Sequence, residues 1–312
     1  MNLNLKQLEA FVWVADLGSF RKAADRLNTT QPNISSRIAS LEAILNVTLM
    51  ERDAGSVRLT SKGQELLLHA RKVLRTTEDL VEASDRAALY DGVLKLGVTE
   101  LIVHTWLRDF LKVLKVRFPN VLVELTVDLS INLVKDLFAR SIDLAFQNGP
   151  FDRQVSGSRD LGSYPLIWVA SPSIGLHDRE RVSLEELAQH PILTHARDTR
   201  PYEQVVAHFG TRRNLPARLV PSNNLSACLH MTVDGMGIAT LPAATVSGHL
   251  ATGELVQIGY DWVPDNLDFM ARYDADRSPQ FVAKAAEIAG DIASDFTANF
   301  AVSVSARMVA GG

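Results

Sequence analysis

The chain has 312 residues, of which 46% are hydrophobic and 22% are charged, and its formal net charge is -4 at pH 7. This composition favours a globular protein of about two or three domains and excludes a disordered or fibrous chain. No apolar stretch predicts a membrane span, and the first residues lack the basic and apolar regions of a signal peptide, so we expect a cytoplasmic protein. A single cysteine, Cys228, excludes an internal disulfide and a cysteine cluster that binds metal.

Charge is distributed unevenly along the sequence, although the difference is small. Residues 1–62 contain eight basic and six acidic residues, a net charge of +2, which leaves -6 for the remainder. A basic region is typical of a protein that binds nucleic acid, but a difference of this size also fits an ordinary solvated surface. Charge alone therefore does not decide the function.

Three helices are expected near the N-terminus. Apolar residues at helical spacing predict a first helix over residues 3–17. In residues 19–42 the same spacing occurs on both sides of a polar break, which predicts two helices joined by a tight turn. Thr29 and Thr30 are candidate caps of the second helix, because Pro32 falls in its first turn, where a backbone N–H has no intrahelical partner.

The second helix of this pair has an outward face of short or planar hydrogen-bonding side chains. Ile34, Ile38 and Leu41 form its inward face. The outward face suits the major groove of DNA, where amides bond adenine edges, arginines bond guanine edges or phosphates, and hydroxyls bond phosphates. Each residue alone also fits a solvated helix surface. The candidates for DNA contact on this helix are Gln31, Pro32, Asn33, Ser35, Ser36 and Arg37.

The segment VTLMERDAGSVRLT, residues 47–60, has short apolar runs on both sides of a turn that contains glycine. This pattern predicts a small hairpin. A hairpin beside two such helices is a wing, and its basic residues, Arg52 and Arg58, would reach phosphates or the minor groove.

A long helix, capped by Thr60 or Ser61, is predicted to continue to about residue 89. Residues that recur at alternating steps of three and four form a heptad seam, and some of these residues are small or polar. One interpretation is a dimerisation helix that pairs two DNA-binding heads, and the other is a helix packed on its own domain. Asp91-Gly92 breaks the helix and marks a domain boundary. The seam consists of Leu67, Ala70, Leu74, Thr77, Val81, Ser84 and Ala88.

From residue 93 onward, apolar strands alternate with helices, which predicts an α/β fold with a parallel or mixed sheet covered on both faces. The last ten residues carry little periodic signal and are expected to fray. Helices are expected over residues 105–117, 132–139 and 279–299. Strands are expected over residues 93–99, 121–127, 142–146, 165–171, 191–195, 218–221, 237–242, 255–259 and 267–273.

A series of motifs extends along nearly the whole chain: LKQLEAFVWVADLGSFRKAADRLNTTQPNISSRIASLE, LTSKGQELLLHARKVL, KLGVTE, IDLAF, VDGMGIATLP and GELVQI. In this order they resemble the LysR-type transcriptional regulators. The resemblance implies a homodimer or a homotetramer. It also implies an N-terminal winged helix-turn-helix (residues 1–60), a long linker helix that dimerises (61–90) and an effector domain like periplasmic binding proteins (91–303). That domain would have two α/β subdomains, residues 91–162 with 267–303 and residues 163–266.

The sequence departs from the family pattern at a few positions. Where the family often has an arginine directly after the recognition-helix serine, this chain has Ser36 and places its arginine at position 37. Asn46 stands where a glycine is usual, and Met50 replaces a common phenylalanine at the wing. The first change moves the cation by one residue, so whether Arg37 contacts a base or a phosphate stays open.

An effector cleft is expected between the two subdomains, at strand ends and helix starts. Backbone N–H groups and helix dipoles there favour a polar or anionic ligand. Arg200 would suit a carboxylate, whereas Glu100 would oppose one or favour an amino group. Each candidate also fits a helix cap or a surface loop. The candidates are Thr99, Glu100, Leu101, Ser130, Gln147, Asn148, Thr194, His195, Thr199, Arg200 and Asn223.

The expected function is a sequence-specific DNA-binding regulator, an activator or a repressor, that responds to a small polar or carboxylate metabolite. Its expected partners are a double-stranded DNA operator, the effector and further copies of the chain, with RNA polymerase as a candidate and no membrane. No cofactor and no enzyme activity are expected, because the sequence has no GxSxG, phosphate-loop, dinucleotide or HExxH motif. Cys228 is expected to be a small buried residue. The competing classes, an exported solute-binding protein and an α/β enzyme, would need an export signal or a catalytic constellation.

Overall fold

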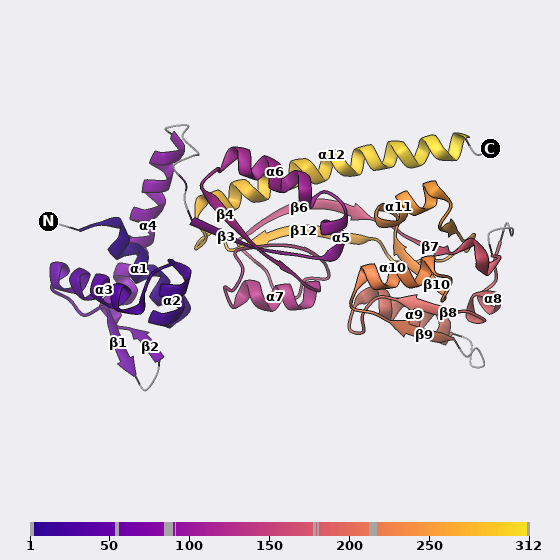
Figure 1. The fold of residues 1–312 in the computed structure, drawn as a ribbon. Coiled ribbons are helices and arrows are strands. Elements are labelled where there is room, and N and C mark those ends of the chain that lie inside the picture. The colour runs from indigo at the N-terminus through magenta and orange to yellow at the C-terminus, as the bar shows by residue number, and fades with distance from the viewer. Residues whose placement is uncertain are drawn as a thin grey trace. The chain divides into compact units, whose positions relative to one another are not determined.

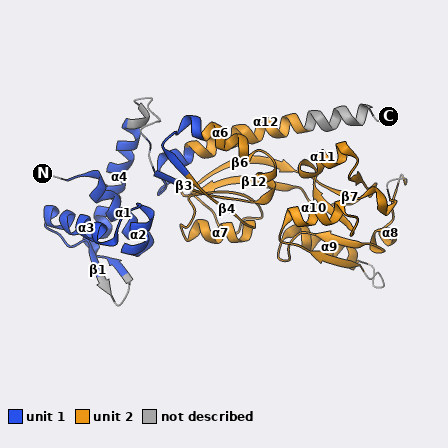
Figure 2. Ribbon diagram, viewed as in Figure 1, with its two compact units in different colours: residues 1–93, 115–122, 275–283 blue, residues 94–114, 123–274, 284–312 orange. Residues whose placement is uncertain are grey.

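The computed structural model describes residues 3–53, 56–83, 90, 92–176, 179, 181–211 and 217–310 (Figure 1). The chain forms two compact units (Figure 2). The first comprises residues 1–93, 115–122 and 275–283, and the second comprises residues 94–114, 123–274 and 284–312. In the described ranges, no helix has both the length and the apolar character needed to cross a membrane.

The N-terminal head is formed by residues 3–59, and its sequence determines where each helix begins and ends. The side chains of Asn4, Ser19 and Thr30 accept backbone N–H groups at the three helix starts. Gly18 and Asn46 end the first and third helices in the left-handed conformation, so Asn46 provides a backbone geometry for which glycine is the usual residue. The elements are α1 (Leu5–Leu17), α2 (Phe20–Arg26), α3 (Gln31–Leu45), β1 (Met50–Asp53) and β2 (Ser56–Leu59). The expected helices and wing are confirmed.

One apolar core holds the head together. Phe11 of α1 and Ile34 and Ile38 of α3 are almost completely buried in it. Leu67 and Ala70, on α4 (Ser61–Ala83), belong to the same core. The first part of the predicted seam therefore packs on its own head.

Other apolar residues of α4 face the solvent. Leu68, Val73 and Leu80 are exposed, so they remain available to a partner molecule. The predicted seam residues Ser84 and Ala88, and the end of the predicted helix, lie outside the described residues.

The start of α4 and the end of α3 both contact the chain segment that enters the wing. The Thr60 hydroxyl accepts the Gly63 backbone N–H at 2.9 Å and caps α4. A Cβ atom on Gly63 would lie 2.1 Å from the Leu49 carbonyl oxygen, so only glycine fits there. Oε1 of Glu42 accepts the backbone N–H groups of Leu49 and Met50 at 2.7 and 3.2 Å. These contacts hold β1 close to α3.

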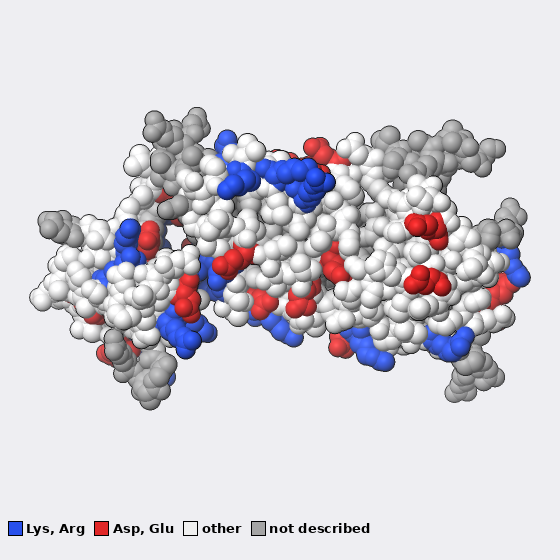
Figure 3. All heavy atoms as spheres, viewed as in Figure 1, with Lys and Arg blue, Asp and Glu red and all other residues white. Residues whose placement is uncertain are grey.

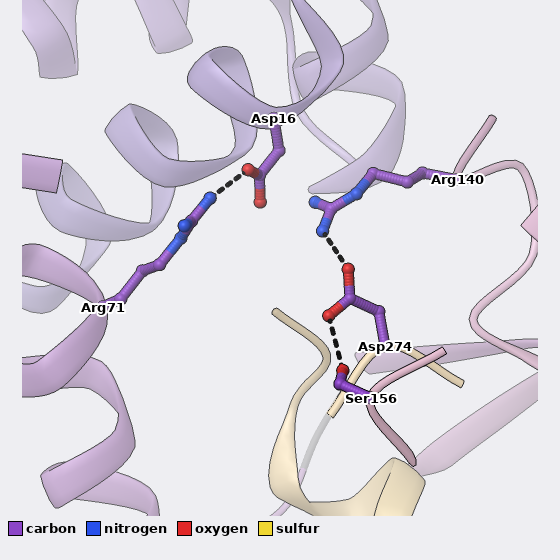
Figure 4. Close-up of polar contacts among 5 residues, drawn as sticks. All are labelled: Asp16, Arg71, Arg140, Ser156 and Asp274. Carbon is purple, nitrogen blue, oxygen red and sulfur yellow. Dashed lines mark hydrogen bonds and ion pairs between the residues drawn. The ribbon is translucent and has the colours of Figure 1, made fainter. Parts of the chain in front are cut away.

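Ion pairs add to the packing within each unit (Figure 4). In the first unit, Arg71 of α4 pairs with Asp16 of α1. In the second unit, Arg140 pairs with Asp274 at 3.3 Å, and the Ser156 hydroxyl donates to the same carboxylate.

A partly buried carboxylate on α4 caps the final helix, α12 (Gln280–Ala310). Oε2 of Glu78 accepts the backbone N–H of Gln280, the first residue of α12, at 3.1 Å. Tyr90 packs nearby against Phe118 and Phe281. Burial raises the pKa of Glu78 to about 7, and the hydrogen bond from Gln280 partly offsets this rise.

The first of two five-stranded sheets has the order β4-β3-β5-β12-β6. β3 and β5 are parallel, and β12 runs antiparallel to both β5 and β6, so the sheet is mixed. Figure 1 shows α6 and α12 along one face and α7 along the other. The elements are β3 (Gly92–Val98), α5 (Glu100–His104), α6 (Leu107–Arg117), β4 (Val121–Val127), α7 (Ser130–Phe138), β5 (Leu144–Asn148), β6 (Gly157–Tyr164) and β12 (Leu267–Tyr273).

The second sheet has the order β11-β7-β10-β8-β9 and is also mixed. Trp168 and Ile192 share a core with α8 and α9, whereas the adjacent Val169 and Leu193 share one with α10 and α11. This alternation covers both faces, as predicted. The elements are β7 (Leu166–Ala170), the short 3-10 helix η2 (Pro172–Ile174), α8 (Leu184–Ala188), β8 (Pro191–Thr194), α9 (Arg200–Gly210), β9 (Arg218–Pro221), α10 (Leu225–Val233), β10 (Ile238–Pro242), α11 (Ala243–Thr252) and β11 (Val256–Gln257).

Three features of this region differ from the sequence-based expectations. Strand β6 was not expected, because GSRDLGSY is polar and contains glycine, a pattern that an edge strand tolerates. The helix expected over residues 105–117 is α6, which begins at Leu107, and the short helix α5 that precedes it was not expected. Helix α12 continues to Ala310, where fraying was expected.

Gly63→Ala should destabilise the head by about 1–3 kcal/mol, because the new methyl group meets a backbone carbonyl. Hydrogen exchange of the α1 and α3 amides measures this loss. Gly248→Ala, in α11, is the control: nothing lies within 4 Å of its added Cβ, so the α11 amides should keep or gain protection. Unchanged exchange in Gly63→Ala would contradict the close contact at Leu49.

The free energy of unfolding should fall as pH rises from about 4.5 to about 7 because of Glu78. In this range the Glu78 carboxyl holds a proton in the folded chain and has released it in the unfolded chain. Glu78→Gln removes this titration. The melting temperature of the variant relative to the wild type should therefore increase with pH across this window. Glu65→Gln is the control, because Lys62 lowers the pKa of that exposed carboxyl. A constant difference between Glu78→Gln and the wild type would refute the assignment.

Candidate functional site

The outward face of α3 carries the candidate DNA contacts. Gln31, Asn33 and Ser36 are exposed, and Ser35 and Arg37 are partly buried, while Ile34 and Ile38 on the inner face are buried. Pro32 is exposed in the first turn, as expected. The helix therefore presents its polar side to solvent.

Some of these side chains are already bonded within the head. Nδ2 of Asn33 donates to the Thr29 hydroxyl at 2.8 Å. No hydrogen bond or ion pair engages the side chains of Gln31, Ser36 or Arg37 in the part of the chain that the structure describes. Their polar atoms are therefore available to a ligand.

The wing adds one described cation. Arg58 on β2 is exposed and lies opposite Glu51 in the hairpin register. The backbone of Arg52 lies in β1, but its side chain is outside the described residues. Basic and acidic side chains are interspersed over the face that Figure 3 shows, so charge by itself does not locate a binding surface.

A cavity of about 1020 Å³ in the second unit lies where strands end and helices begin. Thr99 follows β3, Asn148 ends β5 and Thr194 ends β8, while Ser130 and Arg200 begin α7 and α9. Both five-stranded sheets thus contribute to its wall. Of the sequence-predicted residues, those that line it are Thr99, Glu100, Leu101, Ser130, Asn148, Thr194, His195, Thr199, Arg200 and Asn223.

Gln147 does not line this cavity, contrary to expectation. Its side chain is completely buried in β5, whereas the adjacent Asn148 reaches the cavity. Successive strand residues point to opposite faces, which accounts for the difference between these two neighbours. The Ser130 hydroxyl donates to Oδ1 of Asn148 at 2.8 Å and accepts its backbone N–H at 3.0 Å, which fixes this part of the wall.

Three lining residues have buried polar atoms that lack a partner. Within the described residues, Oγ1 of Thr99, Oγ1 of Thr194 and Nε2 of His195 make no hydrogen bond. Buried polar atoms usually have partners, so such atoms beside a cavity indicate a place for polar ligand groups. Burial lowers the pKa of His195 to about 4, partly offset by a hydrogen bond to the Thr240 backbone, so this imidazole is neutral at neutral pH.

The charged residues of the wall are largely engaged. Arg200 pairs with Asp265 at 2.6 Å, and Gln204 donates to the same oxygen at 2.7 Å. These bonds lower the pKa of the Asp265 carboxyl, the bond from Gln204 most. The guanidinium of Arg153 lies 3.5 Å from the centre of the Phe138 ring. The carboxylate clamp expected from Arg200 is therefore not free.

Several lining residues were missed in the sequence. Asp128 stands directly after β4, and Asp198 stands directly before the candidate Thr199, signals that could have identified them. Phe269 comes from a distant strand and had no local signal. Cys228 lines the cavity too. It is only 4% exposed, as expected, and burial raises the pKa of its thiol to about 12. No group of three or more potential metal ligands occurs among the residues described.

Comparisons with known proteins cover both units. A family model described as LysR substrate binding domain matches residues 87–287, and one described as bacterial regulatory helix-turn-helix protein, lysR family, matches residues 5–64. The transcriptional regulator CfxR of Cupriavidus necator is 29% identical over 256 residues, which are 81% of this chain and 80% of CfxR.

Solved structures share the fold over nearly the whole chain. ArgP of Mycobacterium tuberculosis has a TM-score of 0.62 at 22% identity, with 94% of this chain and 98% of ArgP covered. LysG of Corynebacterium glutamicum, described with bound effector Arg, has a TM-score of 0.57 at 19% identity, with 94% and 99% covered. This chain therefore belongs to the LysR family of transcriptional regulators, with a helix-turn-helix DNA-binding domain and an effector-binding domain.

Proposed function

We propose that this regulator reads its operator with the outward face of α3 and contacts the DNA backbone with its wing. The observation that supports this is the set of polar side chains on a helix whose other face is buried: Gln31 and Ser36 are exposed and Arg37 is partly exposed. In this proposal Gln31 bonds an adenine edge, and Arg37 bonds a guanine edge or a phosphate. Asn33, which is bonded to Thr29, acts mainly by holding the helix start.

We also propose that the cavity binds the effector that controls transcription. The unpartnered atoms of Thr99, Thr194 and His195 support a small polar ligand. Because Arg200 is paired with Asp265, a carboxylate is less favoured than the sequence suggested. LysG, a structural relative, is described with bound effector Arg, which is a small polar molecule.

The assembly we propose is a dimer or a dimer of dimers. Val73 and Leu80 of α4 are exposed and, at i and i+7, share one face of the helix, which a second copy can cover. Two heads would then require two half-sites in the operator, spaced by helical turns of DNA. The chain would act in the cytoplasm without catalysing a reaction, and RNA polymerase is a candidate partner for activation or repression.

The double variant Gln31→Ala with Arg37→Ala should bind operator DNA at least about tenfold more weakly, because each good base contact contributes about 1–3 kcal/mol. A gel-shift titration measures the loss. Lys112→Ala, which removes an exposed cation on α6, is the control and should bind like the wild type. Equal affinity of the double variant and wild type would show that α3 is misassigned.

A single Arg37→Ala variant decides which kind of contact this residue makes. A base contact predicts relaxed specificity at one operator position, whereas a phosphate contact predicts uniformly weaker binding and a shallower salt dependence. Gel shifts on singly substituted operators at several salt concentrations separate these outcomes. No change in either quantity would remove Arg37 from the interface.

Thr99→Val should weaken effector binding by about tenfold or more, because it leaves a polar ligand group without its partner. Calorimetric titration of the full chain with a panel of amino acids and small organic acids identifies the ligand and measures this loss. Arg200→Ala should have a smaller effect, because Asp265 already engages that guanidinium. A large loss in Arg200→Ala alone would instead support the carboxylate clamp.

A further inference from the structure

A carboxylate from one wall of the cavity is bonded to a helix start on the other wall. Glu100, the first residue of α5, accepts the backbone N–H of Leu225 and, at 3.0 Å, Nδ2 of Asn224. The Ser226 hydroxyl lies 3.4 Å from the same carboxylate, and Nε2 of His104, at the end of α5, makes a 2.8 Å hydrogen bond to this hydroxyl. Since α5 follows a strand of the first sheet and α10 packs on the second, these bonds connect the two walls.

The contact has the chemistry of an anion bound at a helix N-terminus. The first N–H groups of a helix lack intrahelical acceptors and carry partial positive charge, so they attract anions. On α10 the Asn224 side chain accepts the Ala227 N–H at 2.6 Å, and Glu100 accepts the Leu225 N–H. The chain thus supplies its own anion at this helix start, beside the cavity that Asn224 and Leu225 also line.

We propose that Glu100 is a built-in clasp that holds α10 against α5 and keeps the effector cavity closed when no ligand is bound. The inference rests on the proposed effector cavity and concerns how that cavity opens. An anionic ligand group can reach the start of α10 only by displacing Glu100. Other ligands can bind with the clasp intact.

The chain contains its own reporter for this opening. Cys228 is the single cysteine of the sequence, lies on α10 one turn after Leu225, and lines the cavity. The residue is 4% exposed because it also packs in the apolar core between α10 and the second sheet, and burial raises the pKa of its thiol to about 12, so it reacts slowly with thiol reagents. When Glu100 is released, α10 can loosen from this core, which exposes the thiol and accelerates the reaction.

The test measures the rate at which 5,5′-dithiobis(2-nitrobenzoic acid) modifies Cys228 in the full chain, without operator or effector. Glu100→Ala should raise this rate by about tenfold. The variant loses a charge-assisted hydrogen bond, which shifts the equilibrium toward the open form in which the thiol reacts. Glu100→Gln, which keeps an acceptor oxygen but loses the charge, should give a smaller increase. Ser226→Ala should also increase the rate, because it removes the hydroxyl that His104 binds.

Matched controls separate opening from unfolding. Glu287→Gln removes an exposed carboxylate that pairs with Lys284 on α12 and should leave the rate unchanged, while Cys228→Ser should abolish the signal. Circular dichroism verifies that each variant is folded, and the isosteric Glu100→Gln decides the result if Glu100→Ala unfolds. A wild-type rate in folded Glu100→Gln would overturn the clasp. Because the assay uses neither DNA nor effector, its outcome is independent of whether the operator and effector predictions hold.

Discussion

The burial of one face of α3 is the constraint on which the DNA-binding head depends. Ile34, Ile38 and Leu41 are almost fully buried against α1 and α2, which turns the polar side chains of the same helix to solvent. The same core includes residues of α4, so the reading helix and the linker helix are fixed relative to each other by apolar packing. Glu42, at the last turns of α3, holds the start of the wing through two backbone N–H groups. Apolar packing and the hydrogen bonds to Glu42 thus position α3 and the start of the wing.

A second constraint shapes the effector domain. Strands of two mixed sheets end at the same cavity, so side chains that are far apart in sequence, such as Thr99 and Thr194, are brought to one place. Alternation along the strands decides which of two neighbours reaches that place, as Asn148 and Gln147 demonstrate. Several charges of the wall are engaged by protein partners, and the buried atoms without partners among the described lining residues belong to neutral hydroxyl and imidazole groups.

Much of this architecture could be predicted from the sequence, because the signals were local. Helix caps such as Thr30, the glycine-containing turn of the wing and the apolar strands each depend on a few adjacent residues. What could not be predicted depends on tertiary contacts: the polar edge strand β6, the pairing of Arg200 with Asp265, and the bond from Glu100 to a helix more than a hundred residues away. The seam of α4 was ambiguous for the same reason, since its first residues are buried by the head.

The central claim is that one chain contains an operator-reading helix and a separate cavity that senses a small molecule. Hydrogen exchange of the full chain, measured alone, with operator DNA and with the effector, tests both parts together. Operator should protect amides of α3 and the wing, and effector should protect amides at the ends of β3, β5 and β8 and at the starts of α7, α9 and α10. Operator protection that spares α3, or effector protection away from these strand ends, would contradict the account.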